Sequence, residues 1–196
     1  MNIALKNNKR VEASPGQTAS CPMCGDSVVS KCGQIKVWHW AHKSADCDHW
    51  SEPESEWHKN WKNKFPLHWQ EVVIGKHRAD IKTPVKVIEI QSSNISSGDI
   101  IERERFYGDM IWILKGEDFE DNFELRHRGY IHTFRWKHPR KVWWSAEMPI
   151  FIDFQKGFFE VKKIYPQTPC GGYGKFIDKG GFIKSFHIKT LSELIG

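Results

Sequence analysis

The chain has 196 residues, with 29 Lys and Arg against 24 Asp and Glu, which gives a formal net charge of +5 at pH 7. This length allows one domain with a real core and a small appendage. The slight positive charge is compatible with a nucleic-acid partner but does not require one. No segment has the apolar length of a signal peptide or a membrane span, so we expect a cytoplasmic protein without a membrane partner.

Residues 1–20 are polar and predict a short strand or arm. Residues 21–50 look like a zinc module in a reducing compartment, because five cysteines are an odd number and two of them form Cys21-x-x-Cys24. Gly25 permits the tight turn after these thiols, and a hairpin over 28–31 and 35–40 follows. The predicted ligands of a closed, structural zinc site are Cys21, Cys24, His39 and His42. Two alternatives stay open: Cys47 replaces one histidine, or the CxxC is a redox pair.

Residues 51–66 predict a helix. Ser51 and Glu54 have the S-x-x-E spacing of a capping box, and Phe65-Pro66 ends the helix. Glu54, His58 and Lys62 then share one helix face. Glu54 is therefore either a simple cap or an acidic group that belongs to a site.

The next stretch predicts two strands, 72–81 and 85–91, joined by a turn at 82–84. The second strand has apolar residues on both faces, which indicates a central, covered strand. A buried carboxylate such as Glu89 is costly unless something pairs with it or binds it. Asp80 lies across the turn, and two carboxylates on adjacent strands can converge on one hard cation. Arg78 shares the face of Asp80, so it either pairs with that carboxylate or reaches a phosphate.

Residues 94–116 predict a helix and a buried strand. Ser96 and Asp99 form a second capping signal, the helix runs over 97–107, Gly108 ends it, and 110–114 is an unbroken apolar strand. A parallel crossover follows from this order. Arg103 on the helix either holds an acidic side chain in place or contacts a phosphate.

The C-terminal third predicts a loop at 117–128, strands at 130–136, 149–154 and 158–164, a Gly/Pro-rich loop at 166–181 and a short C-terminal helix that residues 192–196 close. Segment 135–144 interleaves basic and aromatic residues. This composition fits a DNA-binding surface, and it equally fits a β-layer that packs Trp beneath a wet face. The DNA-binding candidates are Arg78, Arg103, Arg135, Lys137, Arg140 and Lys141.

Six short motifs, in this order, resemble the competence protein CoiA-like branch of the PD-(D/E)xK nuclease superfamily. They are CPMCG at 21–25, HWAH at 39–42, ESEWHKNWK at 54–62, RAD at 78–80, EIQSS at 89–93 and RERFYG at 103–108. The resemblance covers residues 17–115 best. It implies an α/β (α+β) fold with a restriction-endonuclease-like αβββαβ core at 51–116. A zinc-finger module at 1–50 precedes this core, and a β-rich extension at 117–196 follows it.

The resemblance also implies a metal-dependent endonuclease or nickase acting on double- or single-stranded DNA in uptake, recombination, repair or phage-related processing. Glu54, Asp80 and Glu89, with the backbone carbonyl of Ile90, would hold Mg²⁺ or Mn²⁺. Gln91 replaces the motif lysine and would orient water or a phosphate oxygen, and Lys62 is expected to supply the missing positive charge. His58 completes the catalytic candidates. One alternative is a DNA-binding recombination accessory protein whose nuclease fold no longer cuts, and another is a zinc-stabilised scaffold.

Overall fold

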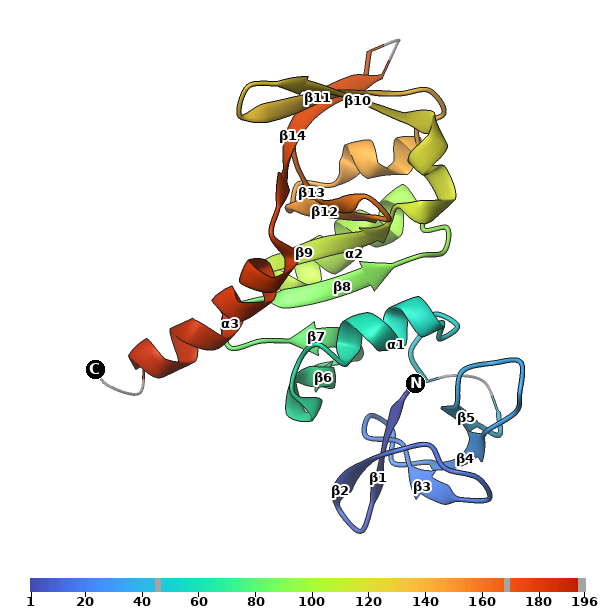
Figure 1. The fold of residues 1–196 in the computed structure, drawn as a ribbon. Coiled ribbons are helices and arrows are strands. Elements are labelled where there is room, and N and C mark those ends of the chain that lie inside the picture. Colours follow the sequence, from blue (N-terminus) through green and yellow to red (C-terminus); the bar gives the residue numbers. More distant parts are fainter. Residues whose placement is uncertain (45–46, 168–169, 194–196) are drawn as a thin grey trace. The chain divides into compact units, whose positions relative to one another are not determined.

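The computed structural model describes residues 1–44, 47–167 and 170–193. The chain divides into two compact units, residues 1–82 and 83–196, whose elements are drawn in Figure 1. Within the described residues, no helix combines the length and the apolar character needed to cross a membrane.

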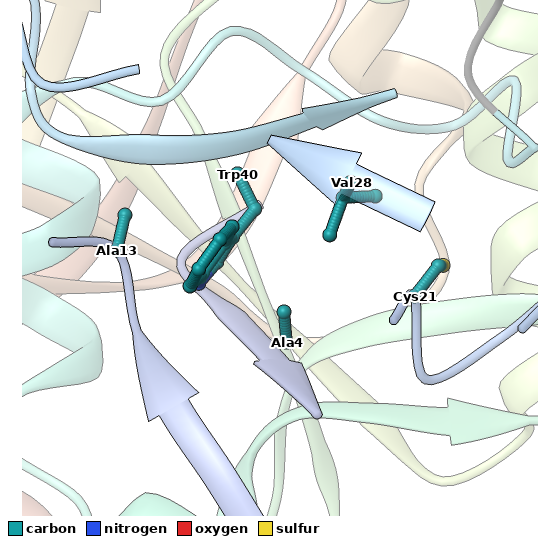
Figure 2. Packing of buried hydrophobic residues seen from close by; sticks show 5 residues of the cluster. All are labelled: Ala4, Ala13, Cys21, Val28 and Trp40. Carbon is teal, nitrogen blue, oxygen red and sulfur yellow. The ribbon is translucent and has the colours of Figure 1, made fainter. Parts of the chain in front are cut away.

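The first unit begins with an antiparallel sheet of five short strands in the order β2-β1-β3-β4-β5. Their bounds are Ile3–Lys6 (β1), Lys9–Glu12 (β2), Thr18–Ser20 (β3), Ser27–Lys31 (β4) and His39–His42 (β5). Figure 2 shows the small core of this sheet, where Trp40 packs among Ala4, Ala13, Cys21 and Val28. The Trp40 indole N–H donates to the carbonyl of Val11 at 3.1 Å, so its one polar atom is satisfied. The predicted N-terminal arm is therefore part of a sheet.

The first unit continues with helix α1 (Glu56–Lys62), the 3₁₀-helix η1 (Leu67–Trp69) and strands β6 (Gln70–Ile74) and β7 (His77–Lys82). The prediction of one strand over 72–81 is wrong, because β6 and β7 form an antiparallel hairpin with Ile74 opposite His77. Gly75 makes the tight turn at φ +53°, a backbone conformation that glycine adopts at little cost.

Helix α1 begins later than the sequence predicted. Ser55, not Ser51, is its N-cap, and the Ser55 hydroxyl accepts from the His58 amide at 3.3 Å. Ser51 instead accepts from the Arg78 guanidinium at 3.0 Å. Glu54 consequently lies just before the helix and is not part of a capping box.

The second unit contains the predicted crossover. Strand β8 (Val87–Gln91), helix α2 (Ser97–Tyr107) and strand β9 (Met110–Lys115) follow one another, and β8 pairs with β9 in parallel, with Glu89 opposite Trp112. The capping box of Ser96 and Asp99 is confirmed, and so is the end of the helix at Gly108. Along the chain, α1, β6, β7, β8, α2 and β9 have the predicted αβββαβ order, and the mixed α+β class is confirmed.

The rest of the second unit is rich in β-structure, as predicted. Its strands are β10 (Phe123–Arg128), β11 (Ile131–Trp136), β12 (Ile150–Phe154), β13 (Gly157–Tyr165) and β14 (Gly171–Ile177). Its helices are η2 (Glu117–Asn122), η3 (Lys141–Ser145) and α3 (Lys179–Glu193). Within this unit the strand order is β10-β11-β14-β13-β12-β9-β8.

Two C-terminal predictions are wrong: residues 117–128 form η2 and β10 rather than a loop, and the Gly/Pro-rich stretch 166–181 contains β14. The predicted C-terminal helix is found, but α3 has 15 residues and is not short. In β14 the glycines serve close strand packing, because a Cβ at Gly172 would lie 2.0 Å from the carbonyl oxygen of Lys163. A glycine-rich composition usually predicts a loop, but here the glycines belong to a closely paired strand. Residues 194–196 lie outside the described residues.

Candidate active site and zinc site

A buried lysine surrounded by three carboxylates dominates the first unit. The Lys62 ammonium at the end of α1 lies 3.0 Å from Glu54 Oε2, 3.0 Å from Glu71 Oε1 on β6 and 3.1 Å from Asp80 Oδ1 on β7. The Asp80 side chain is 23% exposed, whereas that of Lys62 is 4% exposed. We call these four residues the Lys62 cluster. The structure thus brings together three residues predicted for the site and adds Glu71.

The charges of the cluster stabilise one another. Burial disfavours a charged Lys62, but Glu71, Asp80 and Glu54 outweigh it and raise the pKa of Lys62 well above its ordinary value. Burial likewise acts to raise the pKa of Glu71, but Lys62 and other positive groups hold that pKa far below its usual range. Lys62 and Glu71 are therefore both ionised at neutral pH.

Glu71 is the functional candidate that the sequence analysis missed. Its carboxylate accepts from the backbone amides of Asn2 at 2.7 Å and Ile3 at 2.9 Å, and its backbone has φ +46°. In the hairpin register it lies opposite Asp80, between the pairs Gln70–Ile81 and Val72–Ala79. Two like charges at opposed positions destabilise a sheet unless a cation lies between them. The turn at Gly75 was the signal that would have revealed this pair.

The donor set of the cluster fits a hard divalent cation. Glu54 Oε1 is buried and has no hydrogen-bond partner among the described residues, and Asp80 keeps partial access to solvent. Carboxylate oxygens are the ligands that Mg²⁺ and Mn²⁺ prefer. These donors suit the predicted metal, and Glu54 and Asp80 are the residues of this unit that would hold it.

His58, the other predicted catalytic residue on α1, lies at the start of the helix. Its side chain is buried, and its ring bonds the Ser55 hydroxyl through Nδ1 at 2.8 Å. Its Nε2 lies 3.8 Å from Glu52. These contacts stabilise the first turn of α1.

Arg78 and His77 are organised around a second acid. The Asp48 carboxylate accepts from the amides of Trp50 at 3.0 Å and Arg78 at 2.8 Å, and it bonds His77 Nδ1 at 2.9 Å. The His77 ring stacks on Trp50. Asp48, His49 and His77 lie close enough to share a metal ion, but both Asp48 oxygens already accept hydrogen bonds. This arrangement favours a structural role, in which Asp48 ties the segment after Cys47 to β7.

In the second unit, Glu89 has the partner that its buried position requires. Arg103 Nη1 donates to Glu89 Oε2 at 2.9 Å, and the two side chains are 8% and 5% exposed. Gln91 is buried on the same strand and donates through Nε2 to the Ser93 carbonyl at 3.2 Å. Ile90 lies between them and pairs with Ile113 of β9. Of the two roles predicted for Arg103, this geometry corresponds to the holding of an acidic side chain.

A group of three cysteines and one histidine in the first unit could bind zinc. Ligand atoms of Cys21, Cys24, His42 and Cys47 all lie within 4.8 Å of one another. The Sγ atoms of Cys21 and Cys47 are 3.7 Å apart, and Cys24 Sγ lies 3.3 Å from His42 Nε2. Zn–S bonds of about 2.3 Å in a tetrahedron put two sulfur atoms roughly 3.8 Å apart. The group therefore has the size and the donors of a structural zinc site.

The backbone of the turn supports the Cys21 thiolate. The Met23 amide donates to Cys21 Sγ at 3.4 Å, and Gly25 closes the turn at φ +82°. Burial and the neighbouring Cys21 and Cys24 raise the pKa of Cys47 to about 12. Thiols this close together are all deprotonated only when a cation balances their negative charges. Bound zinc would be such a cation.

The predicted ligand set differs from this group at one position, because the structure places Cys47 where His39 was expected. His39 and His42 lie three residues apart on β5, and side chains three apart on a strand point to opposite faces. His42 therefore faces the cysteines, whereas His39 Nδ1 bonds the Val37 carbonyl at 2.8 Å.

The basic segment of the second unit is divided between core and surface. Trp136 is buried and stacks on Phe119, and Trp143 is buried against Trp112. Trp144 is 37% exposed, with the Lys141 ammonium 5.8 Å from its ring centroid. The interpretation of a β-layer that packs Trp is thus confirmed for Trp136 and Trp143, and the DNA-binding surface stays a prediction, for which Trp144 has an exposed ring.

The predicted DNA-binding side chains of this segment line the same part of the surface as Trp144. Arg135, Lys137, Lys141 and Trp144 border a hollow of about 480 Å³. Lys137 pairs with Glu124 at 2.6 Å, and Arg140 lies 3.6 Å from Asp118 and over the Phe119 ring. We call Arg135, Lys137, Lys141 and Trp144 the Trp144 patch.

Comparisons with known proteins place the chain in a family. The model of the competence protein CoiA N-terminal domain matches residues 5–49, and the model of the competence protein CoiA nuclease-like domain matches residues 55–191. No curated protein and no solved structure matches the chain. The predicted three-part division at residues 50 and 116 stays a prediction.

Proposed function

The chain belongs to the competence protein CoiA family, and from this premise we propose that it is a metal-dependent DNA endonuclease or nickase. The observation that carries the proposal is the Lys62 cluster in the nuclease-like domain, where one ammonium contacts three acids. Structural ion pairs rarely gather three carboxylates at one buried cation, because burial of each charge costs free energy. Such a concentration of buried charge marks a functional site.

Each residue of the cluster has a distinct part in the proposed reaction. Glu54 and Asp80 offer oxygen ligands, and a bound Mg²⁺ or Mn²⁺ would polarise the scissile phosphate and lower the pKa of an attacking water. Lys62 supplies the positive charge that Gln91 lacks, and its ammonium lies 3.0 Å from Glu54 Oε2 and 3.1 Å from Asp80 Oδ1. In the second unit, Glu89 and the carbonyl of Ile90 are the further ligand candidates, with Arg103 fixing Glu89.

The experiment that tests this proposal is DNA cleavage by the purified protein. Supercoiled and single-stranded DNA are incubated with Mg²⁺ or Mn²⁺, and the products are separated on gels. Cleavage is expected from the wild type and is expected to be lost in Asp80→Asn and, separately, in Glu89→Gln. The matched control is Asp109→Asn, which removes an exposed acid that pairs with Lys86. Equal cleavage by Asp80→Asn and the control would contradict the proposal.

A second candidate function rests on Gln91. Its amide bonds Ser93 and cannot act as a cation, so a DNA-binding recombination accessory protein that no longer cuts is the alternative. It predicts DNA binding that falls with salt and no divalent-ion-dependent product with any DNA form. The same assay therefore separates the two functions.

A further inference from the structure

Glu71 is the most heavily engaged acid of the first unit, and the proposed reaction gives it no part. Its Oε1 accepts from the Asn2 amide at 2.7 Å and from the Lys62 ammonium at 3.0 Å. Its Oε2 accepts from the Asn2 amide at 2.9 Å and from the Ile3 amide at 2.9 Å. A carboxylate offers about four acceptor sites, so these donors leave Glu71 no site for a metal ion. In this respect it differs from Glu54.

The backbone of Glu71 is held in an unfavourable conformation. Its φ of +46° lies in the left-handed region, which glycine or asparagine adopts more readily than glutamate. Arg10 donates to the carbonyl oxygens of Gln70 and Glu71 on either side of this residue. Such strain persists only where the surroundings determine the conformation, and it concentrates at functional sites. The side-chain contacts of Glu71 therefore outweigh the unfavourable backbone conformation at this position.

The contacts of Glu71 join two parts of the first unit that are far apart in sequence. On one side it receives the backbone amides at the start of β1, and on the other it receives Lys62. A lysine side chain has many rotamers, and three carboxylates at about equal distance fix its ammonium at one point. Glu71 is the most deeply buried of the three, with its side chain 2% exposed.

We propose that Glu71 is a positioning residue that fixes the Lys62 ammonium between Glu54 and Asp80 and makes β1 part of the support of the site. This inference rests on the proposed nuclease function. Glu71 acts on Lys62 and touches neither substrate nor metal. Its consequence is that the N-terminal segment contributes to activity through the backbone amides of Asn2 and Ile3.

The test uses the zinc-loaded protein of 196 residues and two variants. Glu71→Gln keeps the shape but removes the charge, and Glu71→Asp keeps the charge but shortens the reach to Lys62. The matched control is Glu12→Gln, which removes a half-exposed acid of the same unit that pairs with Lys59. The first readout is the position of the Lys62 ammonium in crystal structures of the wild type and the variants. The second is the division of the cleavage rate into kcat and KM for DNA.

The expected results separate positioning from plain stability. In Glu71→Gln, the Lys62 ammonium moves away from its place between Glu54 and Asp80, and kcat falls about 10²-fold with KM nearly unchanged. In Glu71→Asp, the negative charge is kept but the ammonium is still displaced, and kcat falls as well. Glu12→Gln matches the wild type in both readouts.

Two outcomes would overturn the inference: a Lys62 ammonium that keeps its wild-type position in Glu71→Gln, or a wild-type kcat in Glu71→Asp. If Glu71→Gln does not fold, the Glu71→Asp variant decides by kcat. If the wild-type protein does not cleave DNA, the nuclease function fails, and the position of the Lys62 ammonium in the variants still decides whether Glu71 fixes it.

Discussion

At the scale of single residues, the pair of Arg103 and Glu89 leads to a direct prediction about stability. Both side chains are buried and joined at 2.9 Å. Removal of one partner leaves an uncompensated buried charge, which costs about 3–5 kcal/mol. Arg103→Met is therefore expected to lower the free energy of unfolding by about that amount, as measured by urea denaturation. The double variant Arg103→Met/Glu89→Gln should recover part of the loss, and a purely additive double variant would show that the pair is not coupled.

The Glu71 carboxylate predicts how stability depends on pH. Its pKa in the folded state lies far below its unfolded value of about 4.3, because Lys62 and the backbone amides outweigh burial. The folded state then binds fewer protons, so stability from Glu71 is complete above the unfolded pKa and is lost as the pH falls through the range below it. The free energy of unfolding of Glu71→Gln should be lower than that of the wild type by about 3 kcal/mol at pH 7. At pH 3 the variant should be less destabilised. A larger difference between the two proteins at pH 3 than at pH 7 would contradict the lowered pKa of Glu71.

The buried charges also show how far sequence can predict a site. Glu89 stood out because its strand has apolar residues on both faces, and Lys62 stood out because the predicted helix placed it on the same face as Glu54. Glu71 did not stand out, because its opposition to Asp80 exists only after the chain turns at Gly75. The residues of a site are thus visible in sequence where one element presents them. They are missed where the register of two strands brings them together.

At the scale of elements, the geometry of β5 predicts the zinc ligands. Cys47→Ser and His42→Asn should each lower zinc content and the melting temperature, because each removes a ligand of a closed site. His39→Asn should keep one zinc per chain, because His39 faces away from the cysteines. Metal analysis by plasma mass spectrometry, with thermal unfolding, measures both effects. Loss of zinc in His39→Asn with retention in Cys47→Ser would restore the predicted ligand set.

Elements were predicted best where local sequence determines them. Helix α2 has its cap at Ser96, its end at Gly108 and an apolar strand after it, and all three are found as expected. Strand β14 was missed because Gly172 and Gly174 serve close contact with the carbonyls of Lys163 and Glu160. That requirement comes from the neighbouring strand and leaves no signal in local propensity.

At the scale of the whole molecule, the charge distribution bears on the proposed DNA partner. A net charge of +5 over 196 residues is too small to attract DNA through the total charge alone. Affinity should therefore depend on local groups, and the Trp144 patch offers both cations and an exposed ring. One cation of the patch, Lys137, already pairs with Glu124. We therefore expect Lys141 and Trp144 to contribute most.

These two side chains should affect binding in different ways. Lys141→Ala removes one phosphate contact, so the dependence of log affinity on log salt should become shallower by about 0.7–0.9, the value for one neutralised phosphate. Trp144→Ala removes a stacking surface and should weaken single-stranded DNA binding by about 1–3 kcal/mol without a change in that salt dependence. Fluorescence anisotropy of labelled oligonucleotides over a salt series measures both quantities in the Asp80→Asn background, where cleavage does not interfere. The control is Tyr130→Ala, which removes a fully exposed aromatic ring outside the patch. If Tyr130→Ala weakens binding as much as Trp144→Ala, the contact with DNA is general to exposed rings and the patch has no special role.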